Sequence, residues 1–379
     1  MKLSHSKLSC ILSCPMSYHL IYDVGIYKKV PKTALTIGSA VHWGIEHNTE
    51  DLTEFWNENA AYKQVDTYNR DQVLAESMVH GYMKHKEELL DKLLTDPQTG
   101  EKLELLDETH EIYLSGKLKS KILEEGHNFV GIIDLLITTE KGFIIVDYKT
   151  STQIPDWDNY LDQLYRYIFE LKCNFPDIPV VKIAIINLRK TGIRQKKGET
   201  DFQFTQRTKQ EYEINDEALV NYHEFLPKDI NMTFVNNYIA NLEIMADMAQ
   251  TIVDNRLFFI NCGAAKGQYG KSDFWDIFYR TPGAEAIYDI SDRVWNEDEE
   301  RFEDHRPCVA LDMRVIDLDL NILNKYSIFK NCLLATTSQT KEEFFKELEQ
   351  WYVVDTNLLE TYWKTFVKEK EVDNASKQQ

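Results

Sequence analysis

The sequence predicts an α/β protein with a mixed central sheet flanked by helices. Hydrophobic residues make up 43% of its 379 residues, which is enough for a sizeable core. Helical spacing comes first, a cluster of apolar strands follows, and helix, strand and more helices come after it. This order is typical of an α/β core that carries helical insertions.

The first hundred residues are predicted to be mainly helical. Residues 4–22 mix apolar and polar side chains at helical spacing. Ser39 is a candidate N-cap for a helix over 40–46. Residues 51–95 continue the helical pattern as far as Asp96-Pro97.

Strand signals then replace the helical pattern. Residues 103–115, 128–139 and 142–149 are rich in β-branched and aromatic side chains. The last of these runs is continuously apolar at its centre, which is typical of a strand buried on both faces. Thr139-Glu140-Lys141-Gly142 is predicted to form the hairpin turn that joins the last two strands.

The remaining chain is predicted to alternate between the two kinds of element. Further strands are expected over 180–188 and 202–214. The acidic stretch 296–300 is expected to be an exposed loop, and the polar tail 373–379 to be frayed. Helical spacing continues in four further segments: 159–172, 216–226, 231–257 and 341–371.

No membrane or disulfide chemistry is expected. The N-terminus has no long apolar run, and no stretch approaches the roughly 18 apolar residues of a membrane span. Six cysteines spread over 379 residues are too sparse for a disulfide scaffold. We therefore expect a soluble, intracellular (cytoplasmic) protein without a membrane partner.

The net charge of −19 argues, taken alone, against binding to nucleic acid. Net charge governs the long-range field, however, and leaves a local basic groove open. One short stretch gathers five basic side chains, which either contact DNA or form a solvated loop tip. These are Arg189, Lys190, Arg194, Lys196 and Lys197.

The end of the buried strand carries groups that can do chemistry. Asp147 and Lys149 are two residues apart, so they share one face of the strand. Asp134 lies near the end of the preceding strand, across the hairpin, where its carboxylate can converge with that of Asp147. Two carboxylates and a backbone carbonyl suit Mg²⁺ or Mn²⁺. A solvent-facing strand end is the alternative interpretation of the same residues.

The surrounding motifs favour the chemical interpretation. Gly131-Ile132-Ile133-Asp134, Asp147-Tyr148-Lys149 and a helical Gln163-x-x-x-Tyr167 resemble the RecB-like exonuclease branch of the PD-(D/E)xK nucleases. Two upstream motifs are similar to the same branch. They are Leu3-Ser4-His5-Ser6-Lys7-Leu8 with Cys14-Pro15, and Gly38-Ser39-Ala40-Val41-His42.

The resemblance implies a restriction-endonuclease-like core with helical insertions and a C-terminal appendage. The nuclease domain would cover residues 1–280, with a helical insertion at about 50–100. Residues 281–379 would form an α/β or helical appendage, which could dock a protein partner. The implied activity is metal-dependent hydrolysis of DNA by an exonuclease at free ends, in recombination, repair or DNA degradation.

The resemblance also implies roles for the matching residues. His42, Asp134 and Asp147 would hold the metal together with the Tyr148 carbonyl. Lys149 would be the catalytic lysine. Gln163 and Tyr167, one helical turn apart, would line the DNA path. Glu108 or Glu111 could add a further carboxylate, although a solvent-facing glutamate on a strand is ordinary.

The sequence departs from many relatives at their four-cysteine iron–sulfur motif. Cys14 fits the first ligand position, but Tyr269, Ser272 and Phe278 stand where the other three cysteines would be. A hydroxyl or a phenyl ring cannot replace a thiolate on iron. We therefore expect no iron–sulfur cluster, and we expect Cys14 to be a buried structural cysteine.

Two alternatives remain at this stage. One is a non-catalytic DNA-binding or partner-binding module on a nuclease fold. The other is a nucleotide-binding enzyme that uses Lys271, because Ala265-x-x-x-x-Gly270-Lys271-Ser272 matches a relaxed phosphate-loop pattern. A true phosphate loop needs a strand before it and a helix after it.

Overall fold

The computed structural model divides the chain into two compact units. The first, called the sheet unit, comprises Met1–His5 and Val30–Asp247, and the second comprises Ser6–Lys29 and Met248–Gln379. The described residues are 2–29, 32–59, 67–225, 232–267, 270–278, 287–291, 294–296, 301–303, 307–310, 342, 343 and 346.

The sheet unit contains the long predicted strands and the helices that cover them. Its strands are β1 (Lys2–Leu3), β3 (Leu105–Leu118), β4 (His127–Thr139), β5 (Gly142–Ser151), β6 (Val180–Arg189) and β7 (Val220–Phe225). Its helices are α3 (Thr33–Glu46), α4 (Thr53–Glu58), α5 (Tyr68–Leu93), η3 (Trp157–Tyr160), α6 (Leu161–Asn174), α7 (Asp201–Ile214), α8 (Asp216–Leu219) and most of α9 (Met232–Asp254).

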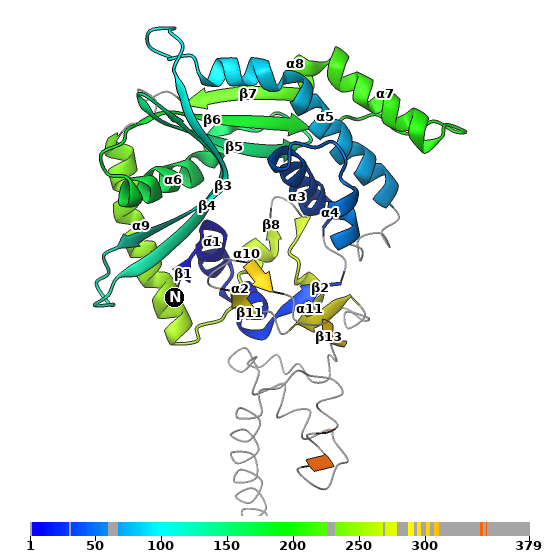
Figure 1. Ribbon diagram of the computed structural model, residues 1–379. Helices are drawn as coiled ribbons and strands as arrows, with labels where there is room; N and C mark the ends of the chain where they lie inside the picture. The colour runs from blue at the N-terminus through cyan, green and yellow to red at the C-terminus, as the bar shows by residue number, and fades with distance from the viewer. Residues whose placement is uncertain are drawn as a thin grey trace, which may run out of the picture. The chain divides into compact units, whose positions relative to one another are not determined.

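The six strands form one mixed sheet, which confirms the predicted fold class. The order is β1-β4-β5-β6-β7, and β3 pairs with β4. Antiparallel pairing joins β3, β4 and β5, whereas β5 and β6 run parallel because α6 carries the chain back between them. In Figure 1, β5, β6 and β7 lie side by side in the upper part of the picture.

Helices cover both faces of this sheet, as the continuous apolar run of β5 predicts. Ile144 and Val146 pack with α3 and α5 on one face, whereas Ile145 packs with α6 on the other. All three side chains are fully buried. The alternation follows from the two-residue period of a strand. The same period determines the face of the sheet on which each side chain after Val146 lies.

The predicted turn between β4 and β5 is confirmed. Thr139 and Gly142 pair at its base, and the Thr139 hydroxyl donates to the Gly142 carbonyl at 2.7 Å. Gly142 has a φ of 133°, which side-chain-bearing residues rarely adopt.

Two predicted elements have the opposite type. The expected strand over 202–214 is helix α7, which opens with a capping box between Thr200 and Gln203. Its buried side chains, Phe204, Thr208 and Tyr212, recur every four residues, which is the helical period that the strand prediction overlooked.

The expected helix over 216–226 and the expected N-cap at Ser39 are also wrong. After the single turn of α8, residues 220–225 form β7 and pair with β6, because the sheet edge offers more backbone hydrogen bonds than a short helix. Ser39 lies inside α3, which begins six residues earlier at Thr33.

Apart from the end of α9, the described residues of the second unit form short elements. The helical ones are α1 (His5–Ser13, whose first residue belongs to the sheet unit), α2 (Pro15–Tyr18), η1 (His19–Val24), α10 (Cys262–Ala265) and α11 (Trp275–Phe278). The strands are β2 (Ile26–Lys28), β8 (Lys266–Gly267), β9 (Gly270–Lys271), β10 (Tyr288–Ser291), β11 (Val294–Asn296), β12 (Arg301–Glu303) and β13 (Pro307–Ala310). Cys14 is buried, as expected.

Several predictions concern residues outside the described part of the chain. They are most of the helix over 341–371, the tail 373–379, the loop residues 297–300, and Tyr269. Within the described residues, the structure contains no helix that combines the length and apolar character needed to cross a lipid bilayer.

Candidate active site

The end of β5 holds the buried acid and the lysine that the strand period predicts on one face. The side chain of Asp147 is 1% exposed, and its Oδ2 lies 2.5 Å from Nζ of Lys149, which is 20% exposed. The carboxylate is therefore sealed inside the protein, while the ammonium group stands between it and solvent.

Asp134 lies where β4 and β5 cease to pair. The last paired residues are Leu135 and Val146. One oxygen of Asp134, Oδ2, accepts a hydrogen bond from the backbone N–H of Tyr148 at 2.7 Å. This bond ties the carboxylate to the Asp147-Tyr148-Lys149 strand end and leaves the other oxygen, Oδ1, directed elsewhere.

Helix α3 brings the predicted histidine to Asp134. Nδ1 of His42 lies 3.7 Å from Oδ1 of Asp134. The helix approaches the end of β5 closely: a Cβ atom added to Gly38 would lie 3.3 Å from the hydroxyl of Thr150. The glycine of the histidine motif thus serves the packing that places His42.

Glu111 is the site residue that the sequence left as an ordinary strand glutamate. The pairs His110–Leu135 and Ile112–Ile133 flank it, so it stands opposite Asp134 on the neighbouring strand. Ligand atoms of His42, Glu111 and Asp134 all lie within 4.8 Å of one another. These three side chains could hold a metal ion.

The carboxylates of this cluster repel one another in the absence of a cation. Burial, reinforced by the charge of Asp134, raises the pKa of Glu111 to about 7. Burial also raises the pKa of Asp147 to about 6, against the opposing effect of Lys149. Like charges on directly opposed strand residues are destabilising, so the site favours a positive charge between them.

Gln163 and Tyr167 reach the same cluster from α6. The Gln163 side chain accepts from Nζ of Lys149 at 3.2 Å, and its NH₂ group donates to the Tyr167 hydroxyl at 2.6 Å and to Asp147 at 3.4 Å. Tyr167 is buried, so it holds Gln163 in place. Tyr160 adds an aromatic ring whose centroid is 5.2 Å from Nζ of Lys149. That the Gln163-Tyr167 pair lines a DNA path stays a prediction.

The five basic residues divide into two groups. Arg189 ends β6 and donates to the Ala218 carbonyl, and Lys190 is partly buried. Arg194, Lys196 and Lys197 are exposed in the connection to α7. The second group therefore presents charge to solvent, whereas the first contributes to local structure.

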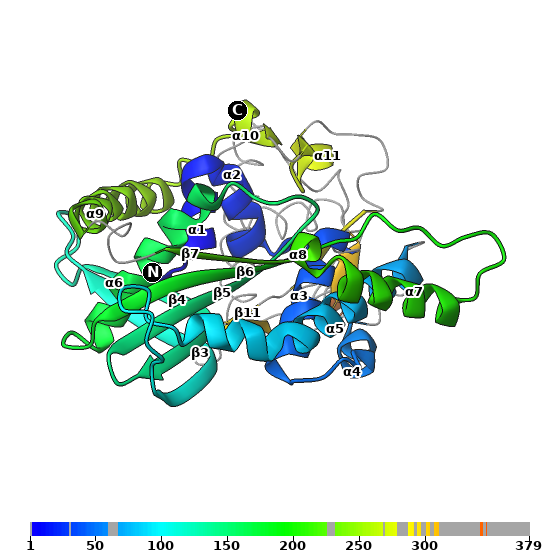
Figure 2. The same cartoon turned by 90° about the horizontal axis from the view of Figure 1, so that it is seen from above.

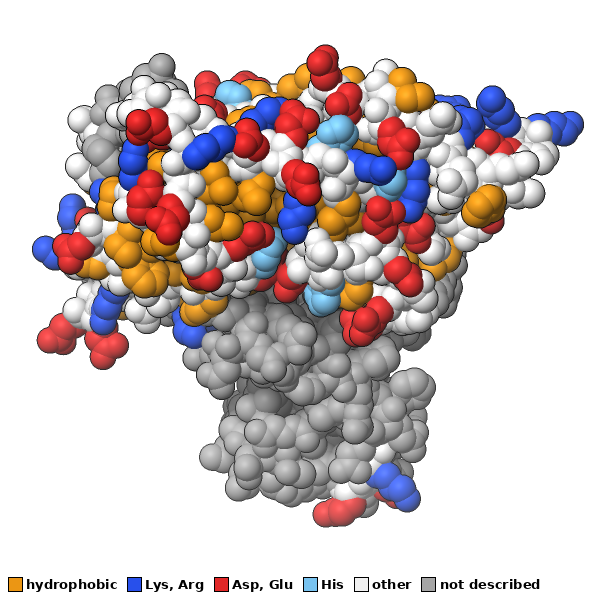
Figure 3. All heavy atoms as spheres, turned by 45° about the horizontal axis from the view of Figure 1, so that its top comes forward, with side chains coloured by type: hydrophobic (Ala, Val, Ile, Leu, Met, Phe, Trp, Pro, Cys, Tyr) orange, Lys and Arg blue, Asp and Glu red, His pale blue; other side chains and the backbone are white. Residues whose placement is uncertain are grey.

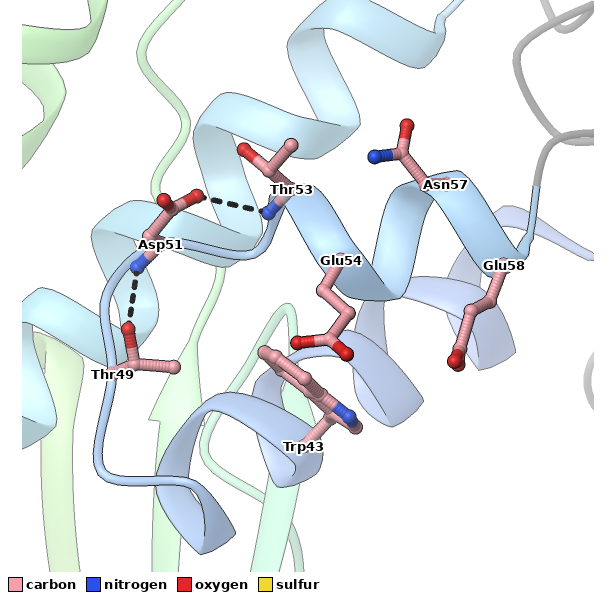
Figure 4. Close-up of a pocket in the computed structure, with 7 residues that line it drawn as sticks. All are labelled: Trp43, Thr49, Asp51, Thr53, Glu54, Asn57 and Glu58. Atoms are coloured by element: carbon pink, nitrogen blue, oxygen red, sulfur yellow. Dashed lines mark hydrogen bonds between the residues drawn. The ribbon is translucent and has the colours of Figure 1, made fainter.

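A surface hollow of about 650 Å³ lies where α3 ends and α4 begins (Figure 4). Backbone-to-side-chain bonds from Asp51 to Thr49 and from Thr53 to Asp51 shape the loop between the helices. Its lining carries the carboxylates of Asp51, Glu54 and Glu58, which repel phosphate, and includes none of the clustered residues above.

The phosphate-loop alternative does not fit the geometry around Lys271. Gly270 and Lys271 form strand β9, which pairs with β8. Residues 257–260 are not a strand, and the helix that follows, α11, has only four residues. A phosphate loop requires a strand before the loop and a long helix after it.

Fold and site together define a class: an α/β core in which carboxylates, a lysine and a histidine gather near the end of β5. A family model of the PD-(D/E)XK nuclease superfamily matches residues 2–237, which is more than half of the chain. The protein belongs to the PD-(D/E)XK nuclease superfamily. It is a nuclease, and its substrate is a nucleic acid.

Two solved structures that are similar to this chain are distant in sequence. A protein from Eubacterium rectale described as a candidate exonuclease is 14% identical, covers 64% of this chain and 82% of its own, and has a TM-score of 0.37. The protein SSO0001 is 12% identical, covers 51% of this chain and 79% of its own, and has a TM-score of 0.18. No curated protein matches the chain. The family assignment therefore rests on the family model.

Proposed function

We propose that this nuclease is a metal-dependent deoxyribonuclease, and specifically an exonuclease that acts at DNA ends in recombination, repair or DNA degradation. The observation that carries the proposal is the cluster of His42, Glu111 and Asp134, whose ligand atoms lie within 4.8 Å of one another. It stands beside the buried ion pair of Asp147 and Lys149.

The donor set fits Mg²⁺ or Mn²⁺. Carboxylate oxygens are the ligands that both ions prefer, and the candidate set contains more carboxylates than imidazoles. Oδ2 of Asp147 is buried and forms an ion pair with Lys149 at 2.5 Å, so a bound cation would compete with Lys149 for this oxygen. His42, Asp134, Asp147 and the Tyr148 carbonyl are the proposed ligands, and Glu111 is a further one.

The protein side chains supply the remaining chemistry. When bound, the metal polarises the phosphodiester and lowers the pKa of a water molecule. Lys149 carries a positive charge, because the carboxylates of Asp147 and Asp134 raise its pKa against the effect of burial. Its ammonium group is proposed to orient the attacking water and to offset the charge that develops on the phosphate. Gln163 fixes the direction of that ammonium group.

The proposal is tested by incubating linear and covalently closed circular DNA with the protein, with and without Mg²⁺ or Mn²⁺. An exonuclease degrades only the linear form. Asp134→Asn and Lys149→Ala are expected to lower kcat by a factor on the order of 10² or more. Asp107→Asn and Lys119→Ala change exposed side chains outside the cluster and serve as matched controls.

Each remaining outcome has a distinct meaning. Nicking of circular DNA would show that the enzyme is an endonuclease. Cleavage of RNA alone would show that the substrate is RNA. Mn²⁺ binding by calorimetry without any cleavage would favour the non-catalytic module. Equal cleavage by the wild type and both site variants would overturn the site assignment.

A further inference from the structure

The chain between β6 and α7 leaves the sheet at the same edge as the candidate site. Because β5 and β6 are parallel, Lys149 pairs with Asn187 and Ser151 pairs with Arg189. The backbone N–H of Lys190 then donates to the Ser151 carbonyl at 2.7 Å. The connection therefore starts beside Ser151, two residues after Lys149. This is the edge of the sheet at which α/β proteins bind ligands.

This connection and the first residues of α7, residues 191–202, form a projection that we call the basic arm. In Figure 2 it extends at the right of the view, beyond α5, before the chain returns through α7. Figure 3 shows Lys and Arg side chains gathered over this projecting part, at the upper right. Arg194, Lys196 and Lys197 are its exposed basic residues.

The arm is braced by its own side chains. Glu199 accepts hydrogen bonds from the backbone N–H of Lys196 at 2.7 Å and from Arg207 at 2.8 Å through two nitrogens. Arg207 also donates to the Arg194 carbonyl at 2.9 Å. Gln195 donates to the Glu199 carbonyl at 3.0 Å. The backbone that carries the cations is thus ordered before any ligand arrives, which lowers the entropic cost of binding.

The base of the arm is anchored as firmly. Tyr212 of α7 is fully buried, and its hydroxyl donates to the Arg189 carbonyl at 2.5 Å. On the same helix, Lys209 pairs with Glu50 at 2.7 Å. The arm is therefore held at both ends, where β6 ends and where α7 packs against α5.

The arm also presents an aromatic ring. Phe202 is 73% exposed, whereas Phe204, on the same turn of α7, is 2% exposed and packs inward. A single exposed apolar side chain is ordinary on a protein surface. Next to three exposed cations on an ordered projection, the ring matches the combination of phosphate contacts and base stacking by which proteins hold single strands.

We propose that the basic arm binds a single-stranded segment of the nucleic-acid substrate, with Arg194, Lys196 and Lys197 on phosphates and Phe202 stacked on an unpaired base. The proposal rests on the proposed function, because it names the form of the substrate of the same site. The arm carries three basic and two acidic side chains, and one of the acids, Glu199, is paired with Arg207, so the arm is locally cationic in a chain whose net charge is −19.

The geometry limits how far from the cut this contact lies. Eight residues separate Arg189 from Lys197, and an extended chain spans at most about 3.5 Å per residue, or about 28 Å in all. At about 3.4 Å per stacked nucleotide, the arm reaches no more than about eight nucleotides from the sheet edge. Oligonucleotides of 20 residues are long enough to engage both regions.

The test measures binding of a fluorescent 20-residue single strand and of a blunt 20-base-pair duplex by anisotropy, in EDTA so that no cleavage occurs. Lys196→Ala/Lys197→Ala is expected to weaken single-strand binding about tenfold. On a plot of the logarithm of the association constant against the logarithm of the salt concentration, the magnitude of the slope should fall by about 1.4. This is about 0.7 for each lost phosphate contact. Lys119→Ala/Lys121→Ala, two exposed lysines on the β3–β4 loop, is the matched control and should change neither quantity.

Phe202 is tested in the same assay. Phe202→Ala is expected to weaken single-strand binding about tenfold and duplex binding less than twofold, and Phe202→Trp should restore single-strand binding. Ile214→Ala, which removes a side chain 66% exposed at the other end of α7, is the control. Thermal unfolding checks that each variant is folded.

The results separate this proposal from the proposed function. If Lys196→Ala/Lys197→Ala leaves the single-strand affinity and its salt dependence unchanged, the basic arm does not bind the single strand, even if the wild type cleaves DNA. Equal loss of single-strand and duplex binding by Phe202→Ala would overturn the stacking. A wild type that binds single strands through the arm but never cleaves would overturn the nuclease mechanism and leave the arm intact.

Discussion

Glu170 occupies the space that a side chain on Gly131 would need. A Cβ atom added to Gly131 would lie 2.2 Å from Oε2 of Glu170. Glu170 is fully buried and forms an ion pair with Arg166 at 2.8 Å, one turn away on α6. Arg166 donates in turn to the backbone carbonyls of Leu3 and Val130. The motif glycine before Asp134 thus makes room for the ion pair that joins α6, β1 and β4.

Gly131→Ala is therefore expected to destabilise the protein. The buried carboxylate cannot give way without breaking its pairing with Arg166, and loss of a buried pair costs about 3 kcal/mol or more. Urea unfolding should show a lower midpoint. Gly192→Ala is the matched control, because nothing lies within 4 Å of its added Cβ. A midpoint equal to that of the control would contradict the steric account.

The sequence predicted those parts of the site that depend on local pattern. The two-residue period places Asp147 and Lys149 on one face, and the turn at Thr139 and Gly142 brings Asp134 beside them. These relations involve neighbours within one hairpin. They need no knowledge of how distant elements pack.

The sequence leaves the choice between Glu108 and Glu111 open, because the place of Glu111 depends on strand register. It faces Asp134 only because β3 pairs with β4 so that Leu118 meets His127. The loop of that hairpin lies between Leu118 and His127, and it is not among the turns predicted from the sequence. Once that turn is fixed, counting back along both strands puts Glu111 opposite Asp134, which is the signal that could have found it.

The misassigned elements have a similar cause. Residues 202–214 contain β-branched and aromatic side chains, which favour a strand locally. The capping box of Thr200 and Gln203 and the burial of Tyr212 stabilise a helix instead. Residues 220–225 form a strand because the edge of β6 is available to them. In both segments, tertiary contacts outweigh the local propensity of the side chains.

Glu111→Gln is expected to weaken Mn²⁺ binding about tenfold, because the cluster loses one of its negative charges while its shape is retained. Isothermal titration calorimetry measures the effect. Glu108→Gln is the control, since Glu108 lies on the same strand but bonds to His110 at 3.2 Å. If both variants bind Mn²⁺ as the wild type does, Glu111 is no ligand.

Acid should weaken the contact between the β4–β5 turn and the end of α5. Oδ2 of Asp96 bonds to Lys141 at 2.6 Å, and Oδ1 accepts from the backbone N–H of Gln98. The Lys141 bond, followed by the Gln98 bond, lowers the pKa of Asp96 from 3.8 to about 2. A depressed pKa stabilises the folded state above about pH 4, and this stabilisation is lost as the pH falls from 4 to 2.

The stability difference between the wild type and Asp96→Asn should therefore be constant from pH 7 to 5. It should shrink as the pH falls below 4, where the wild-type carboxyl group becomes protonated. Urea midpoints across this range measure the difference. Asp177→Asn, at an exposed position between α6 and β6, is the control. A difference independent of pH would show that shape, and not charge, matters at this position.

Tyr167→Phe is expected to lower kcat about tenfold with little change in KM. Its hydroxyl is the 2.6 Å partner that fixes the NH₂ group of Gln163, and the Gln163 carbonyl holds the ammonium group of Lys149. Without that hydroxyl the amide can rotate, and Lys149 loses the bond that directs it toward the attacking water. Because Tyr167 is buried and contacts Gln163, we expect it to act through Gln163, so that the loss falls on kcat.

Tyr165→Phe is the control for this prediction, because it removes the same hydroxyl two residues away on α6, where Tyr165 packs against Tyr238. Steady-state cleavage of a labelled linear duplex over a range of substrate concentrations separates kcat from KM. A rise in KM at constant kcat would instead assign Tyr167 to the DNA path. Equal kinetics for both variants would mean that Lys149 keeps its direction through Asp147 alone.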